Sequence, residues 1–255
     1  MIIISPLRLK RFTVQLKELS IRDCIALSSI PEHMQHESAS FFLSRAIESV
    51  EGLSDFEQWT VQERTMVICH YMSGTYDDGP DFKVGELNYS DYLAGTEYAK
   101  DDFNAGEVGG NNWTVTHLTG RIARSLERLV GEVEGLNDYA YWQIALMAAQ
   151  MSPSNVDSEY WTDDEGLSDS DLDVEMLRRI SAMAAFPESS FTILWDKWVQ
   201  ANTEIGHLIS MSFNDKGLLC LSVPKEEALG IYPARFPASS VITTIARRLG
   251  GKFKE

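Results

Sequence analysis

The sequence predicts an α+β protein in which helices dominate and one or two small antiparallel hairpins supply the strands. Apolar residues recur at helical spacing in about seven stretches, whereas strand-like alternation is short and lies beside turn residues. A chain of 255 residues, of which 44% are hydrophobic, also has enough apolar material for a sizeable core. A disordered or fibrous chain is therefore excluded.

The N-terminal segment predicts a strand followed by two helices. Apolar side chains alternate along residues 7–16 with a one-residue slip at Lys10, which indicates a strand or hairpin arm with a bulge at the slip. Ser20 then precedes a short helix that ends before Pro31, because the residue before a proline disfavours helical backbone. The apolar spacing of residues 38–50 predicts the second helix.

The strongest local signal is the capping box of Thr60 and Glu63, whose side chains can each bind an unpaired amide at a helix start. The helix that it opens is expected to end near Gly74. Residues 77–81 have the composition of a turn, and residues 82–93 have the spacing of a small hairpin or an extended arm.

The middle of the chain predicts a loop and two helices. Residues 97–112 are polar and glycine-rich, so we expect a long irregular loop, either a binding loop or one without a ligand. Helical spacing returns over residues 116–133, where an apolar stripe runs beside arginines. Residues 137–151 predict a helix that is apolar on most faces, which favours the core over an interface.

The stretch from Asp157 to Glu175 is strongly acidic: nine of its nineteen residues are Asp or Glu, and none is basic. Such a run repels itself and stays solvated unless a cation or a basic partner neutralises it, so we interpret it as a linker. Beyond it the sequence predicts two helices, a hairpin and a last helix capped by Ser239. These elements span residues 171–186, 190–202, 207–223 and 241–249.

These patterns predict three regions. Residues 1–152 form an N-terminal arm and a helical domain, which carries a loop-rich insertion at 75–115. The acidic linker covers residues 153–170, and residues 171–255 form a C-terminal α+β portion around the hairpin at 207–223.

Composition limits the ligands that we expect. The net charge of −16 repels phosphate backbones and anionic lipid, so nucleic acid is not expected as a partner. The longest apolar run, Ile144–Ala149, is far shorter than the roughly 20 residues of a membrane-spanning helix, so membrane insertion is not expected. Cys24, Cys69 and Cys220 are widely spaced, which predicts buried free thiols, and we do not expect the short apolar segment at the start of the sequence to act as a secretory signal.

No motif specifies a reaction. His33, His36, Cys69 and His70 are metal-ligand types, but no further ligands follow at a matching spacing. Residues 169–173 resemble the start of a calcium loop, yet the later positions of that motif do not match. The chain also lacks a Gly-x-Ser-x-Gly nucleophile motif and a phosphate-binding glycine motif. We therefore assign no catalytic, cofactor-binding or metal-binding residue and expect no cofactor.

Residues suited to protein contacts remain. Aromatic side chains enrich interface cores, and several lie in segments that we interpret as loops. Exposed strands can also pair with the sheet edge of a neighbouring protein, which makes the 7–16 arm a candidate docking element. The candidate partner-binding residues are Leu9, Phe12, Val14, Leu16, Tyr92, Tyr98, Trp113, Tyr160 and Trp161.

The N-terminal third carries a series of short segments: Leu9–Asp23, Trp59–Arg64, Ile68–Tyr71, Asp78–Phe82 and Ser90–Leu93. Together they resemble the baseplate-hub and tail-assembly proteins of contractile-tailed bacteriophages, of the T-even-like and related myophage groups. The resemblance covers residues 7–95. It implies a non-enzymatic protein and carries over no catalytic residue.

The resemblance and the residues together favour a structural or assembly protein of a contractile phage tail, in the baseplate or hub. Such a protein would bind other tail or baseplate proteins, be made in the host cytoplasm and stay in the virion. Three alternatives remain open: a transient tail-assembly chaperone absent from the mature particle, a metal-dependent hydrolase with a site built from distant residues, and an adaptor unrelated to phages.

Overall fold

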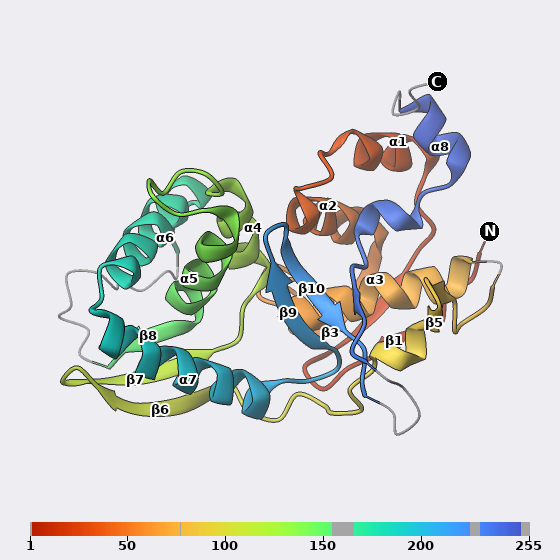
Figure 1. Ribbon diagram of the computed structural model, residues 1–255. Coiled ribbons are helices and arrows are strands. Elements are labelled where there is room, and N and C mark those ends of the chain that lie inside the picture. The colour runs from red at the N-terminus through yellow and green to blue at the C-terminus, as the bar shows by residue number, and fades with distance from the viewer. Residues whose placement is uncertain (1, 77, 155–165, 225–229, 251–255) are drawn as a thin grey trace. The chain divides into compact units, whose positions relative to one another are not determined.

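The computed structural model describes residues 2–76, 78–154, 166–224 and 230–250, and within them it confirms the α+β class (Figure 1). The α-helices of these ranges are α1 (Ile21–Ser29), α2 (Gln35–Ala46), α3 (Val61–Thr75), α4 (Gly120–Arg128), α5 (Asp138–Gln150), α6 (Asp169–Ala184), α7 (Glu188–Ile205) and α8 (Thr244–Leu249). Two short 3-10 helices, η1 (Tyr89–Tyr92) and η2 (Ala238–Val241), accompany them.

All strand pairs between the named strands for which a register is given are antiparallel, and the strands form small sheets. The first sheet contains β1 (Leu7–Arg8), β2 (Phe12–Leu16) and β3 (Ile47–Gly52), and a two-stranded ribbon contains β4 (Lys83–Val84) and β5 (Leu87–Asn88). The other two sheets contain β6 (Asp102–Val108), β7 (Asn111–Thr116) and β8 (Met151–Pro153), and β9 (Ser210–Asn214), β10 (Gly217–Leu221) and β11 (Pro233–Ala234).

The chain forms two compact units, each built from discontinuous segments. The first unit comprises Met1–Tyr98, His207–Ser212 and Leu218–Glu255, and the second comprises Ala99–Gly206 and Phe213–Gly217. The predicted division at residues 152 and 171 does not match these units. In the second unit α6, whose first turns carry the end of the acidic run, packs against α4 and α5, which precede the run, so the predicted linker does not separate two units.

The core of the first unit forms around β2, whose alternate side chains Phe12, Val14 and Leu16 are buried. Strand geometry places every second side chain on the same face, so the predicted alternation here reflects the chain's own core. The ring of Phe12 stacks on Trp59, with the ring centres 3.8 Å apart. β1 and β2 pair as a hairpin, and the slip at Lys10 lies in its connecting turn rather than in a bulge.

The helix predicted for residues 38–50 ends early, because α2 stops at Ala46 and β3 begins at once with Ile47. The backbone of Ile47 is extended, and Val50 lies opposite Val14 in the register of β2 and β3. Pairing with β2 therefore outweighs the helical spacing of these residues. The β-branched side chains of Ile47 and Val50 favour a strand, which makes this pairing easier.

The loop predicted for residues 97–112 is largely a hairpin, so that prediction is wrong. β6 and β7 are joined at Gly109 and Gly110, whose φ angles are 64° and 82°. Positive φ at both central residues is the requirement of a type I′ turn, the tight turn that matches the twist of paired strands. A Gly-Gly pair between alternating segments is the signal that identifies such a hairpin from sequence.

Other predicted elements agree with the structure. The Ser20 cap, the Thr60 capping box, the ribbon near residue 84 and the hairpin within 207–223 are all present. The last helix is an exception, because Thr243 rather than Ser239 caps it; residue 239 lies in η2. Among the described residues, no helix combines the length and hydrophobicity that crossing a bilayer requires.

We predict that Gly52→Ala destabilises the first unit strongly. A Cβ at this position would lie 2.5 Å from the carbonyl oxygen of Arg11, and the φ of Gly52 is +94°. Gly85→Ala is the matched control, because Gly85 also has positive φ but faces open space. Urea unfolding should show a loss of about 1 kcal/mol for the control and about 2–4 kcal/mol for Gly52→Ala. Equal losses of stability for the two variants would show that the positive φ alone, and not the contact with Arg11, determines the destabilisation.

Candidate functional site

A buried polar cluster forms around the start of α3 in the first unit. The amide of Thr60 donates to Glu63 Oε2 at 2.9 Å, and the amide of Glu63 donates to Thr60 Oγ1 at 3.1 Å. Both residues are only 1% exposed. The capping box thus places an ionisable carboxylate inside the protein, which requires a compensating charge.

Arg11, from the turn between β1 and β2, supplies that charge. Its Nε donates to Glu63 Oε1 at 2.9 Å, and its Nη2 donates to Glu63 Oε2, so the ion pair is bidentate. The same guanidinium lies over the ring of Tyr98, 4.5 Å from the ring centre. A cation–π contact of this kind holds the Arg11 side chain in place.

His207 completes the cluster from a distant part of the chain. Its Nε2 and Thr60 Oγ1 share a hydrogen bond of 2.9 Å, and the ring of Tyr98 meets the imidazole edge-on. The next residue, Leu208, has a φ of +59°, the one positive value among the described non-glycine residues. Its amide donates to Thr96 O, and its carbonyl accepts from the amide of Ala94, both at 2.8 Å, which keeps this backbone in position.

We call Arg11, Thr60, Glu63, Tyr98 and His207 the polar ring. A hydroxyl beside an imidazole is the arrangement of an activated nucleophile. Thr60 Oγ1, however, is buried and already accepts the amide of Glu63, so it presents no attacking atom to a substrate. The polar ring therefore acts as a brace that joins the β1–β2 turn, α3 and the segment around residue 207.

A small cavity lies beside α3 in the same unit, with a volume of about 40 Å³. We call it the arginine cavity, because Arg64 of α3 and Arg235 after β11 both line it. Gln35 and His36 of α2 and Cys220 of β10 are further polar or ionisable lining residues. This volume accommodates a few waters or one small ion.

Both arginines are positioned by carbonyl groups. Arg64, which is 1% exposed, donates from Nη2 to His36 O at 3.2 Å and also to Ser40 Oγ, and its Nη1 lies 3.5 Å from Glu57 Oε2. Arg235 donates from Nε to Leu218 O at 3.1 Å. These contacts fix where the two guanidinium groups lie.

The other ionisable groups of the cavity are neutral at pH 7. Burial, and then the charge of Arg64, lowers the pKa of His36 to about 3. Burial raises the pKa of the Cys220 thiol to about 12, and the charge of Arg235 opposes this only partly. Arg64 and Arg235 are therefore the charged residues of the described cavity lining, and Arg64 is ion-paired with Glu57.

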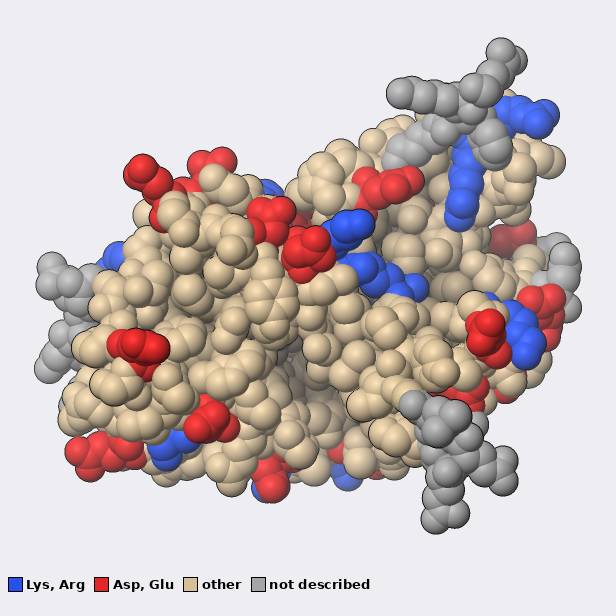
Figure 2. Space-filling model, in the orientation of Figure 1, with Lys and Arg blue, Asp and Glu red and all other residues tan. Residues whose placement is uncertain are grey.

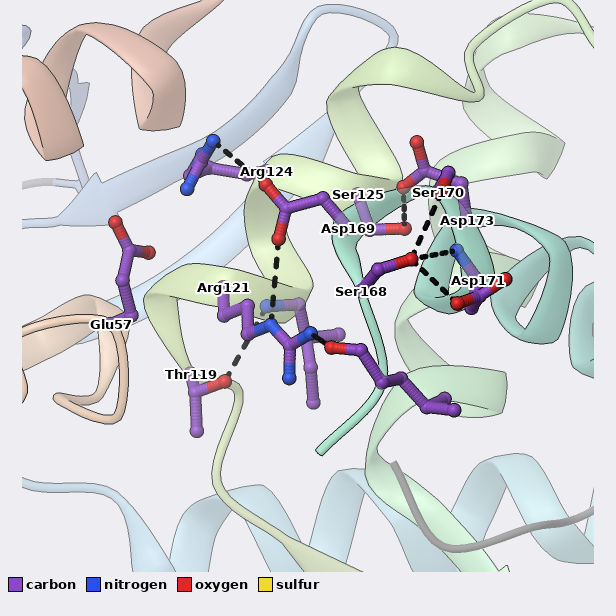
Figure 3. Close-up of polar contacts among 12 residues, drawn as sticks. Glu57, Thr119, Arg121, Arg124, Ser125, Ser168, Asp169, Ser170, Asp171 and Asp173 are labelled. Carbon is purple, nitrogen blue, oxygen red and sulfur yellow. Dashed lines mark hydrogen bonds and ion pairs between the residues drawn. The ribbon is translucent and has the colours of Figure 1, made fainter. Parts of the chain in front are cut away.

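A charged cluster of another kind joins α4 and α6 in the second unit (Figure 3). Arg128 donates from Nη2 and Nε to the two carboxylate oxygens of Asp173, at 2.6 and 2.8 Å, and these hydrogen bonds raise the pKa of Arg128. Arg124 Nη2 lies 3.2 Å from Asp169 Oδ2, and Arg121 Nε lies 3.6 Å from Asp169 Oδ1. The spacing of the arginines on α4 thus matches the spacing of the acids on α6.

This cluster changes the interpretation of the acidic run. Residues 155–165 lie outside the described residues, and so do the predicted contact residues Tyr160 and Trp161. The end of the run forms the first turns of α6, where α4 of the same chain supplies basic partners for Asp169 and Asp173. For these residues the expected solvated linker is wrong, because helix packing brings arginines from 45 residues away.

Most of the predicted partner-binding residues are not on the surface. Tyr98 is partly buried in the polar ring, and Leu9 packs against the core. The others contribute to the chain's own cores, so we no longer assign them to a partner surface; these are Phe12, Val14, Leu16, Tyr92 and Trp113. The sequence shows that these side chains are apolar, but an apolar side chain can lie in an internal core or in an interface, and sequence alone does not separate the two.

The comparisons with known proteins leave the site to be interpreted from its own geometry. No protein-family model, no curated protein and no solved structure matches this chain. Within the part of the chain that the structure describes, no group of three or more His, Cys, Asp or Glu side chains is arranged to hold a metal ion. Nothing in the sequence connects Arg64 with Arg235, since the two residues lie 171 positions apart.

We predict that Thr60→Ala destabilises the first unit more than the loss of an ordinary helix cap does. The substitution removes the cap of α3 and leaves His207 without this hydroxyl, so we expect a loss of about 2–3 kcal/mol. Ser20→Ala, which removes the exposed cap of α1, is the control and should cost about 1 kcal/mol. Denaturant titration checks this, and equal costs would rule out the bracing role.

We predict that His36 makes stability fall in acid. Its pKa is about 3 in the folded protein and about 6.5 when unfolded, so the unfolded chain binds more protons between these values. Stability is then fully present above pH 6.5 and is lost as the pH falls towards 3. His36→Gln should flatten the plot of unfolding free energy against pH between pH 6.5 and 3, by up to about 5 kcal/mol. An unchanged pH profile would contradict the burial of a neutral imidazole.

Proposed function

We propose that this chain is a structural or assembly component of a contractile bacteriophage tail and acts by binding other tail or baseplate proteins. The resemblance of residues 7–95 to baseplate-hub and tail-assembly proteins supports the tail assignment. The observation that carries the protein-binding role is the outward face of α8.

On α8 the long aliphatic side chains point outward. Ile245 and Leu249 are 69% and 60% exposed, whereas the small Ala246 is buried. Residues four apart lie on one helix face, so the two aliphatic side chains are neighbours. Arg247 and Arg248 are also exposed, and Figure 2 shows basic side chains at the end of the first unit where α8 lies. We call these four residues the α8 face.

The α8 face is held firmly on the first unit. α8 packs against α1, and a Cβ on Gly250 would clash with Ser28 Oγ, so the backbone approaches α1 very closely. Burying exposed aliphatic surface in an interface is favourable by roughly 25 cal/mol per Å². Arginines beside it can pair with partner carboxylates, which suits the composition of protein interfaces.

Quantitative mass spectrometry of purified particles and of their lysate tests the proposal. We expect the chain in particles at a small, fixed copy number. If the chain is abundant in the lysate but absent from particles, it is a transient assembly chaperone and not a component that stays in the virion. Absence from both would overturn the tail assignment.

We predict that the double substitution Ile245→Ser and Leu249→Ser reduces incorporation into particles at least tenfold without lowering the melting temperature, because both side chains are already exposed. Val174→Ser is the control, since Val174 is 68% exposed but lies on α6. Complementation of a deletion strain, followed by particle mass spectrometry, measures the effect. Normal incorporation of the double variant would exclude the α8 face as the contact.

A further inference from the structure

We infer that an aromatic surface of the second unit binds a basic, arginine-containing segment of a partner protein. Four rings from α5, α7 and the end of β9 form this surface, which we call the aromatic face. Its residues are Tyr139, Trp195, Trp198 and Phe213. The inference goes beyond the α8 face, which belongs to the first unit, and it does not depend on the phage assignment.

The four rings are in contact with one another. The ring centres of Tyr139 and Phe213 are 5.4 Å apart, and those of Trp195 and Trp198 are 5.0 Å apart. Phe213 joins the two pairs, since its ring centre lies 6.4 Å from those of both tryptophans. Trp and Tyr are enriched among the residues that dominate the binding energy of protein interfaces, so the composition of this face suits a partner.

Buried contacts hold the aromatic face in place. Trp198 is only 8% exposed, and its Nε1 donates to Gln150 Oε1 at 3.0 Å. The side-chain amide of Gln150 donates in turn to Thr116 O at 3.0 Å. A Cβ on Gly217 would lie 3.1 Å from the ring of Trp142, so the β9–β10 turn approaches α5 closely. Little further ordering of these rings is needed when a partner binds.

The outer part of the aromatic face is open to water. Tyr139 is 53% exposed, and Trp195 and Phe213 are partly exposed. Val199 follows Trp195 by one helical turn and is also exposed, so it extends the apolar surface along α7. Exposed apolar clusters with polar residues around them mark interaction sites.

The charge of the second unit favours a basic partner. Its segments contain twenty Asp or Glu and eight Lys or Arg, so this unit carries −12 of the net charge of −16. Three exposed acids adjoin the aromatic face in the chain; these are Asp138, Asp196 and Asp215. Among the described residues, none hydrogen-bonds or forms an ion pair with any of these three carboxylates. A cationic partner can therefore pair with them.

The lysines nearest in sequence do not reverse this charge. Lys197 donates to Ala105 O of β6, which fixes its ammonium group away from a role in the acidic rim. Lys216 adjoins Asp215 in the β9–β10 turn and balances one acid there. Asp138 and Asp196 remain beside the rings.

Arginine matches both features of this surface. Its guanidinium is cationic, so the acidic side chains attract it, and its planar group stacks on the faces of Trp and Tyr rings. Lysine has the same charge but not the planar shape. A surface that uses its rings in recognition should therefore prefer arginine to lysine.

Fluorescence anisotropy of labelled peptides, titrated with the full chain at pH 7 and constant ionic strength, tests the inference. The probes are a peptide of five Gly-Arg repeats and its Gly-Lys counterpart. We expect saturable binding of the Gly-Arg peptide and binding of the Gly-Lys peptide that is at least about threefold weaker. No saturable binding of the Gly-Arg peptide, or equal affinity for both peptides, would overturn the inference.

Two variants test the location of the binding site. Tyr139→Ser should weaken binding of the Gly-Arg peptide about threefold, whereas Tyr232→Ser, which removes a tyrosine of 45% exposure from the first unit, should leave it unchanged. If Tyr139→Ser does not fold, Asp196→Asn takes its place. It should weaken binding about twofold, and more than Glu132→Gln, which removes an exposed acid elsewhere in the same unit.

Equal effects within either pair of variants would exclude the aromatic face as the binding site. Sedimentation velocity examines the other occupant, a second copy of this chain. We expect Tyr139→Ser to leave the sedimentation coefficient unchanged. If the wild-type chain is an oligomer that Tyr139→Ser dissociates, the face is a contact between copies and the inference is wrong.

Discussion

The carboxylate of Glu63 is the group on which the first unit depends. It is buried, and it pairs with Arg11 while it caps α3 through the amide of Thr60. A buried charge is tolerated only when its partners satisfy it, so the positions of the β1–β2 turn and of the α3 start are set together. Thr60 extends the same network to His207, which brings in the segment that returns from the second unit.

The charged residues of this acidic chain are used in two different ways. Within the second unit, arginines of α4 meet acids at the start of α6, and the charges cancel across a helix pair. Beside the arginine cavity, the buried guanidinium of Arg64 lies 3.5 Å from Glu57 Oε2, so its charge is paired within the first unit. The first arrangement explains how an acidic segment can fold, and the second explains how a buried arginine is tolerated. The net charge of the chain alone reveals neither arrangement.

Sequence reasoning identified the local devices and missed the long-range ones. The Thr60 capping box and the hairpin within 207–223 were predicted because their signals lie within a few residues. The apolar spacing of β3 predicted a helix. The segment is a strand because it pairs with β2, which lies more than thirty positions earlier in the chain. The β6–β7 hairpin did have a local signal in Gly109 and Gly110, but its polar composition favoured a loop.

By itself, the sequence determined the α+β class, the caps of α1 and α3, and the helical nature of the segments with sustained apolar spacing. Hydrogen bonds between near neighbours and side-chain periodicity set these features, and both can be read along the chain. Only the tertiary structure decided the division into two units, the polar ring, the arginine cavity and the pairing of Asp173 with Arg128. Each of these joins side chains that are tens of positions apart, and their meeting depends on how whole elements pack.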